Sequence, residues 1–204
     1  MRKMRFVLPV IILGLVLTAG CAKPPQADVD AAKAAVESAR AAGASDYAQA
    51  SLKEAEDGVT ALDAELAAQQ KKFALFRSYK NATTMAATAK ASGEKAVADA
   101  AAGKEKARGE AEAAITGAKA MLEEAKGMLA TAPAGKGSQT DIEAMKNDLT
   151  GVETSVAEAD KAYQEGRFLE SKSAADAANQ RAGSVKAAVQ QAQEMRKAAK
   201  GKRM

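Results

Sequence analysis

The chain contains no histidine, no tryptophan and a single cysteine, and aromatic residues make up only 3% of its 204 positions. Without histidine and with one cysteine, it lacks the commonest zinc ligands and the usual nucleophile–base pairs. A lone cysteine also leaves no partner for an internal disulfide. These absences argue against catalysis, so we expect a protein that is not an enzyme and that holds neither a metal ion nor a cofactor.

Carboxylates gather at two places, Glu54, Glu56 and Asp57 in one and Glu123 and Glu124 in the other. Lysines lie close to them, at the spacing of neighbours on one helix surface. Such clusters are typical of solvated helix faces. We therefore interpret both as surface charge and not as catalytic pairs.

The only cysteine, Cys21, follows a short apolar segment. Residues 1–5 carry three positive charges, and residues 6–17 are apolar apart from one proline and one glycine. An apolar run of about twelve residues is too short to span a bilayer, which takes roughly twenty. The sequence Thr18-Ala19-Gly20-Cys21 resembles a bacterial lipobox, the signal for acylating the cysteine and cleaving before it. An uncleaved membrane anchor is the alternative.

The lipobox resemblance predicts a signal peptide over 1–20, recognised by signal peptidase at Thr18, Ala19 and Gly20, and a lipidated tether over 21–27. Acyl chains on Cys21 would hold the protein in the membrane. Because alanine follows the cysteine, enteric sorting rules imply the outer membrane, with the protein facing the periplasm. Cleavage also removes three of the 30 basic residues and leaves a net charge near +1, so the basic pI gives no support for nucleic-acid binding.

After the signal peptide the chain is rich in alanine, and Pro133 is its only proline beyond residue 25. This composition favours helix almost everywhere. Apolar residues recur at steps of three and four over 29–39, 52–66, 75–129, 142–163 and 168–192, which places them on helix stripes that pack together. The sequence predicts an all-α fold, an elongated antiparallel helical bundle.

An internal repeat suggests how the bundle is organised. Residues 52–62 align with 142–152 at a shift of ninety, and residues 76–97 align with 168–189 at a shift of ninety-two. The repeat predicts two three-helix modules, 28–103 and 104–204. They would share one long helix from about residue 74 to 131, with Gly103 and Gly109 as kink points.

Four turns should separate the helices. They are expected at 43–46, where Ser45 or Asp46 would cap the next helix, near 70–73, at 133–140, and at 164–167 around Gly166. The turn near 70–73 contains neither glycine nor proline and rests on the repeat alone.

Residues 31–101 resemble an uncharacterised family of bacterial lipoproteins, annotated only as a domain of unknown function. The similarity lies in Ala39-Arg40-Ala41-Ala42-Gly43-Ala44, Tyr47-Ala48, Leu52-Lys53-Glu54-Ala55 and Tyr79-Lys80-Asn81-Ala82, with Ala86 and Ala89. The resemblance implies a helical envelope protein, and some members occur beside peptidoglycan-binding domains similar to that of outer-membrane protein A. It brings no catalytic residues.

Aromatic residues cluster at the predicted turns, at Phe73, Phe76, Tyr79, Tyr163 and Phe168. We expect these rings to fill the ends of the bundles where the helices splay. The alternative is a docking patch of exposed aromatics for a partner.

The C-terminal tail is strongly basic, with Arg196, Lys197, Lys200, Lys202 and Arg203 in its last nine residues. These cations could contact anionic lipid headgroups or cell-wall polymer. A helix end that favours cations and then frays is the simpler explanation.

Together these features predict a lipid-anchored structural or adaptor protein of the bacterial cell envelope, with cell wall or envelope proteins as partners. The alternative is a periplasmic ligand-binding or chaperone-like module that uses a groove between its helices. The oligomeric state stays open.

Overall fold

The computed structural model describes residues 23–132 and 139–201. Regular structure in these two ranges is helical throughout, and they contain no strand. The elements are α1 (Gln26–Ala41), α2 (Ala44–Tyr47), α3 (Gln49–Gln70), the 3₁₀ turn η2 (Ala74–Phe76), α4 (Lys80–Ala130), α5 (Gln139–Gln164) and α6 (Phe168–Gly201). The all-α fold predicted from the alanine content is confirmed.

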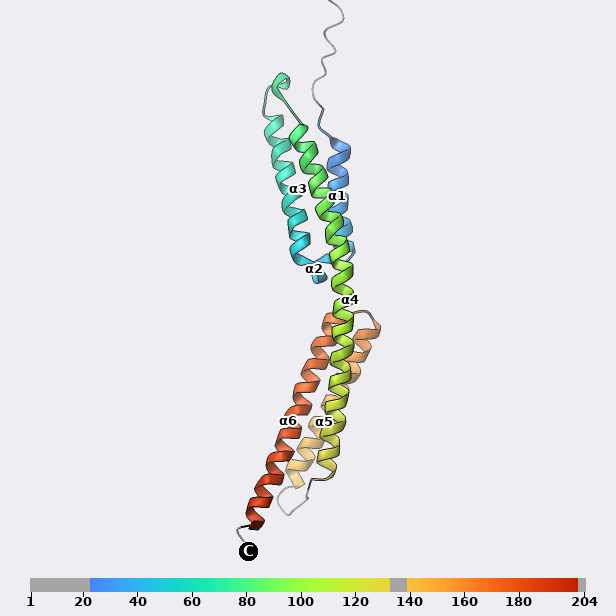
Figure 1. Cartoon of the computed structure of the whole chain (residues 1–204), viewed down its shortest axis with the longest axis vertical. Coiled ribbons are helices and arrows are strands. Elements are labelled where there is room, and N and C mark those ends of the chain that lie inside the picture. Colours follow the sequence, from blue (N-terminus) through green and yellow to red (C-terminus); the bar gives the residue numbers. More distant parts are fainter. Residues whose placement is uncertain (1–22, 133–138, 202–204) are drawn as a thin grey trace, which may run out of the picture. The chain divides into compact units, whose positions relative to one another are not determined.

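The chain divides into two compact units, residues 1–102 and 103–204. Helices α1, α2 and α3 and the first part of α4 form unit 1, and the rest of α4 forms unit 2 with α5 and α6 (Figure 1). Neither Gly103 nor Gly109 ends α4, whose helical backbone continues through both. Between Ala100 and Ala107 no residue of α4 is buried, so each unit has its own core.

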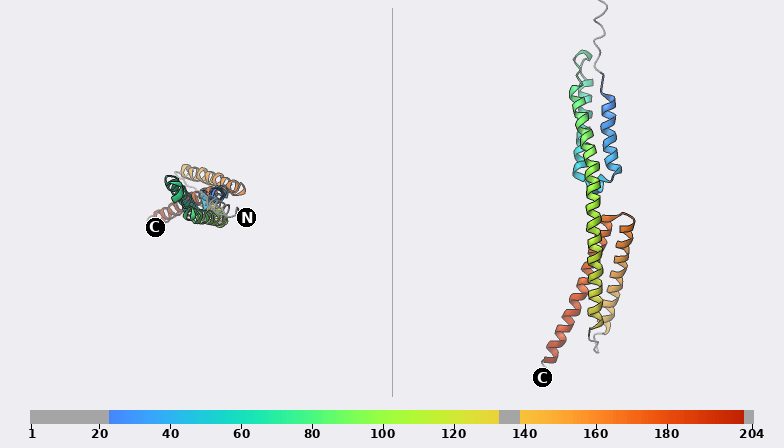
Figure 2. Two further views of the ribbon diagram at one scale, coloured as in Figure 1. Left: turned by 90° about the horizontal axis from the view of Figure 1, so that it is seen from above. Right: turned by 45° about the vertical axis from the view of Figure 1, so that its right-hand side comes forward.

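In unit 1, α1 and α3 run antiparallel and α4 lies against both (Figures 1 and 2). Lys33 Nζ of α1 lies 2.9 Å from Asp63 of α3, and Arg40 Nη2, further along α1, lies 2.7 Å from Glu56. A later residue of α1 thus pairs with an earlier residue of α3, as expected for antiparallel helices. The start of α1 is level with the end of α3.

Alanine supplies 18 of the 32 buried hydrophobic residues among those described. Such small side chains allow helices to approach at the close end of the usual 8–10 Å range. The closest approach at a glycine is between α4 and α1, where a Cβ built on Gly93 would lie 2.8 Å from Cβ of Ala35. The stripes predicted for α1, α3 and α4 in unit 1 supply most of its buried residues, Val36, Leu62 and Ala86 among them.

In unit 2, α5 and α6 are antiparallel and are joined by the predicted turn at Gly166, which has φ 77°. The amide of Arg167 donates to the carbonyl of Ala162 at 2.9 Å, and that of Gly166 donates to Tyr163 at 3.0 Å. This is the Schellman arrangement, in which glycine adopts the left-handed conformation that ends a helix. The buried Ser171 of α6 donates to the carbonyl of Ala159 in α5 at 2.8 Å, which satisfies its hydroxyl.

Three details of the predicted elements are wrong. The shared helix starts at Lys80 and not near residue 74, because residues 74–79 form η2 and an extended segment. Ser45 and Asp46 cap no helix, because Gly43 ends α1 at φ 83° and both residues lie inside α2. Two residues at the ends of predicted stripes are exposed, Leu75 at the start of the stripe over 75–129 and Ala192 at the end of the stripe on α6.

Candidate functional site

The predicted lipidation site Cys21 and the recognition residues Thr18, Ala19 and Gly20 lie outside the described residues. The described chain begins at Lys23, and the carbonyl of Pro25 accepts hydrogen bonds from the amides of Asp28 and Val29, each at 3.1 Å. The prolines thus lead directly into the first turn of α1. The first described residues fix where the chain enters α1.

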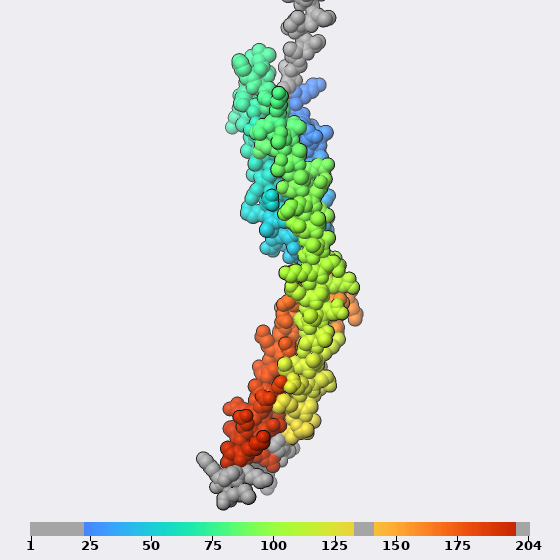
Figure 3. All heavy atoms as spheres, in the orientation of Figure 1, coloured from blue at the N-terminus to red at the C-terminus, as the bar shows by residue number. Residues whose placement is uncertain are grey.

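The start of α1 lies beside the connection between α3 and α4. Val29, 3% exposed, belongs to the same core cluster as Tyr79, the last residue before α4. Figures 1 and 2 show the loop 71–79 and the start of α1 at the same end of unit 1, and the space-filling view in Figure 3 shows both on one face. The chain therefore enters unit 1 next to this loop.

Three large apolar side chains project from that loop into solvent. Phe73, Leu75 and Phe76 are 69%, 77% and 76% exposed, and we term these three residues the apolar tip. The rings of Phe73 and Phe76 face one another at a tilt, with centroids 6.4 Å apart. Exposed hydrophobic residues grouped in this way mark a surface that contacts something else.

Hydrogen bonds hold the loop in place. Arg77 Nε donates to the carbonyl of Lys72 at 3.0 Å, and Nη2 donates to the carbonyl of Gln70 at 2.9 Å. The side-chain oxygen of Gln69, a buried residue, accepts the amide of Ser78 at 3.2 Å. These contacts satisfy the carbonyl of Gln70, which the end of α3 leaves unpaired, and two backbone groups of the loop itself. The apolar tip is consequently presented by an ordered loop.

The corresponding aromatic pair in unit 2 is packed instead. At the shifts of the internal repeat, Phe73 matches Tyr163 and Phe76 matches Phe168. The rings of Tyr163 and Phe168 lie 5.3 Å apart, and Phe168 is only 8% exposed. The expectation that aromatic rings fill the bundle ends is thus correct for Tyr79 and Phe168.

For Phe73 and Phe76 that expectation is wrong. In unit 2, α5 continues to Gln164 and α6 begins at Phe168. Tyr163 and Phe168 therefore both lie on α-helices, where their rings pack against each other. In unit 1 the matching residues lie outside the α-helices, because α3 ends at Gln70 and α4 begins at Lys80. The alternative considered from the sequence, a patch of exposed aromatic rings, describes Phe73 and Phe76.

The apolar tip is surrounded by positive charge. Residues 71–80 include Lys71, Lys72, Arg77 and Lys80 and contain no acidic residue. The three lysines are exposed, and none of the four cations forms an ion pair within the described part of the chain. The loop therefore combines exposed apolar side chains with uncompensated cations.

The basic residues of the tail are only partly described. Arg196 and Lys197 are exposed on α6. The side chain of Lys200 and the residues Lys202 and Arg203 lie outside the described part of the structure. Contact of this tail with an anionic surface stays a prediction.

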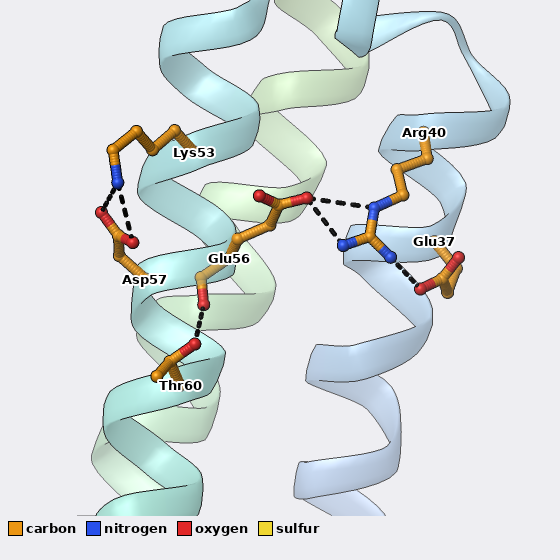
Figure 4. A network of polar contacts seen from close by, with 6 residues as sticks. All are labelled: Glu37, Arg40, Lys53, Glu56, Asp57 and Thr60. Atoms are coloured by element: carbon orange, nitrogen blue, oxygen red, sulfur yellow. Dashed lines mark hydrogen bonds and ion pairs between the residues drawn. The ribbon is translucent and has the colours of Figure 1, made fainter.

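Two of the three carboxylates in the first cluster, Glu56 and Asp57, form surface ion pairs, as Figure 4 shows. Glu56 accepts from Arg40 at 2.7 Å, and Asp57 lies 2.8 Å from Lys53. The hydrogen bond to Glu56, with the nearby charge of Glu37, raises the pKa of Arg40. The hydrogen bond to Asp57 likewise raises the pKa of Lys53. Exposed pairs of this kind stabilise a fold only slightly.

The second cluster is paired in the same way, Glu123 with Lys126 at 2.9 Å and Glu124 with Lys186 of α6 at 2.7 Å. In residues 23–132 and 139–201, no group of three histidine, cysteine or acidic side chains is placed to hold a metal ion. Nor does any helix in these ranges combine the length and apolar character needed to cross a bilayer.

One groove of unit 2 could accept a small ligand. It has a volume of about 430 Å³ and lies between α5 and α6. Met145, Val185 and Ala188 form its apolar part, and Asp148 and Arg181 contribute charged groups.

Comparison with models of known protein families, with curated proteins and with solved structures found no match for this chain. The resemblance of residues 31–101 to lipoproteins of unknown function stays a prediction.

Proposed function

We propose that this chain is a lipid-anchored, non-catalytic structural or adaptor protein of the bacterial cell envelope. Acyl chains on Cys21 attach it to the outer membrane, and its helical units face the periplasm and offer their surfaces to the cell wall or to envelope proteins. The observation that carries the proposal is the lipobox-like Thr18-Ala19-Gly20-Cys21 behind a short apolar run, five residues before α1 begins.

The described helices support a binding role over a catalytic one. Four of the five carboxylates in the two clusters form surface ion pairs, as the Glu56–Arg40 pair illustrates. The cores consist largely of alanine, so the units present long charged faces around a thin apolar interior. Surfaces of this kind suit an adaptor, whose partners bind through complementary shape and charge along a helix.

Photo-crosslinking in living cells tests the adaptor function. A photoreactive residue placed at Lys53 or Lys161, both exposed, reaches any partner that lies on α3 or α5. Lys126 is a third position, although its amine is held between Glu123 and Glu153 at 2.9 and 2.7 Å. A photoreactive residue at the buried Val152 serves as the control.

An adaptor should give discrete crosslinked protein bands from the exposed positions, and Val152 should give none. The bands should disappear with Cys21→Ser, because the protein then loses its place at the membrane. No protein adduct from any exposed position would contradict the adaptor function.

The groove between α5 and α6 favours a second candidate, a ligand-binding or chaperone-like module. This function predicts a lipid or peptide that copurifies with the protein. A bulky substitution at Ala188, which lines the groove, should then release the ligand and leave the crosslinks of the exposed positions unchanged.

A further inference from the structure

We infer that the apolar tip and its four cations form a second membrane contact, which inserts among anionic lipid headgroups beside the anchor. The inference rests on the proposed function, because the acyl chains on Cys21 are what bring this loop to the bilayer. The tip would fix the orientation of unit 1 on the membrane, which attachment at a single point does not do.

The position of the tip in the chain carries the first part of the inference. Only four residues lie between Cys21 and Gln26, and even fully extended the five steps along this chain span at most roughly 18 Å. The start of α1 is level with the end of α3, and Val29 shares a core cluster with Tyr79. An anchor on Cys21 therefore places the headgroup region within reach of the loop 71–79.

The chemistry of the tip carries the second part. Segments that lie at the boundary between headgroups and acyl chains bury phenylalanine and leucine there and carry basic residues beside them. Basic residues are drawn to the negative surface of anionic lipids, and each cation near that surface adds to binding. The tip joins Phe73, Leu75 and Phe76 with four cations and no acidic residue, which is the combination that an anionic bilayer surface binds.

The size of the tip argues against a protein partner. A stable protein interface takes roughly 800 Å² from each partner. Large aromatic side chains bury about 150–250 Å² each, so the three residues of the tip fall short of that area. A bilayer contact needs much less, because the covalent anchor already holds the loop at the surface.

Tryptophan fluorescence provides the test, since the chain has no tryptophan of its own. The full-length protein with Phe76→Trp, produced in bacteria, is reconstituted in vesicles of equal parts phosphatidylglycerol and phosphatidylcholine. We expect the emission maximum to shift to shorter wavelength and bromine-labelled lipids to quench the emission. Gln49→Trp is the matched control, because Gln49 is exposed at the opposite end of α3 and should stay unquenched.

A charge variant tests the role of the cations. Lys71→Glu with Lys72→Glu should weaken attraction of the tip to anionic lipid by on the order of thirtyfold or more. The quenching of the Phe76→Trp protein should then fall to the level seen in pure phosphatidylcholine. Lys104→Glu with Lys106→Glu makes the same change in charge at two exposed positions of α4 and should leave the quenching unaltered.

The mass of the N-terminal peptide, measured on the same sample, shows separately whether Cys21 is acylated. An unacylated cysteine contradicts the proposed function. Whatever that measurement gives, an unquenched tryptophan at position 76 with water-like emission overturns the membrane contact. If the tip instead gives a crosslinked protein adduct in cells and no lipid quenching, its partner is a protein.

Discussion

The close packing of α4 on α1 makes Gly93 a sensitive position. A Cβ built at Gly93 would lie 2.8 Å from Cβ of Ala35 and 2.9 Å from its carbonyl carbon. Cβ atoms in folded proteins essentially never come closer than 3.0 Å to such neighbours. Because one of the contacted atoms belongs to the backbone, Gly93→Ala can be accommodated only if α1 moves.

The magnitude follows from two opposing effects. Replacing glycine by alanine inside a helix stabilises the helix by about 1 kcal/mol. Overpacking of a well-packed core costs about 1–3 kcal/mol, and a clash with backbone belongs at the upper end of that range. We therefore expect Gly93→Ala to lower the free energy of unfolding of unit 1 by about 1–2 kcal/mol.

The matched control is Gly117→Ala in the part of α4 that belongs to unit 2, where a built Cβ meets nothing within 4 Å. Here only the gain in helix propensity applies, so the substitution should stabilise unit 2 by about 0.5–1 kcal/mol.

Hydrogen exchange followed by mass spectrometry on the full chain resolves the two units. We expect faster exchange in peptides of α1 and α3 for Gly93→Ala, and slower exchange in peptides of unit 2 for Gly117→Ala. If Gly93→Ala slowed exchange as much as Gly117→Ala does, α1 and α4 would not be in close contact, and our description of the core of unit 1 would be wrong.

Two further predictions concern a polar contact of unit 1 and the basic tail. Ser51 Oγ donates to Asp99 at 2.5 Å, and this bond together with Lys95 lowers the pKa of Asp99. A lowered folded-state pKa means that the contact stabilises the fold above the unfolded-state pKa and is lost as the pH falls through the folded value. Ser51→Ala should therefore move the pKa of Asp99 up toward its ordinary value in an NMR titration, and an unchanged pKa would show that the hydroxyl plays no part. Deletion of 196–204 should reduce cosedimentation with anionic vesicles, and equal pelleting of both forms would rule out an anionic-surface role for the tail.

Much of the fold could be predicted because apolar spacing and backbone chemistry are local signals. The stripe over 142–163 supplies Leu149, Val152 and Val156 to the core of unit 2. The turn at Gly166 could be predicted because many helices end at a residue in the left-handed conformation, which glycine adopts without strain.

The loop 71–79 could not be predicted in the same way. It contains neither glycine nor proline, and its shape depends on contacts that no periodicity records, such as the guanidinium of Arg77 on the carbonyls of Gln70 and Lys72. The internal repeat favoured a short turn there, like the one at Gly166. The repeat aligns Phe76 with Phe168, yet the ring of Phe76 is exposed and that of Phe168 is buried, because only Phe168 lies on an α-helix.

The predicted site shows the same division between local motif and spatial arrangement. The lipobox is a run of four residues that the sequence alone can suggest, and Cys21 stays a prediction because it lies outside the described residues. That the chain enters unit 1 beside the exposed tip follows only from the antiparallel pairing of α1 with α3, for which Lys33–Asp63 is direct evidence of register.

Metabolic labelling with an alkyne analogue of palmitate tests the lipid anchor, which is the central claim, most directly. The full-length protein should take up the label in bacteria, and Cys21→Ser should abolish the labelling while the helical circular dichroism of the protein stays the same. Retention of the label by Cys21→Ser, or absence of label from the unaltered chain, would contradict lipidation at Cys21.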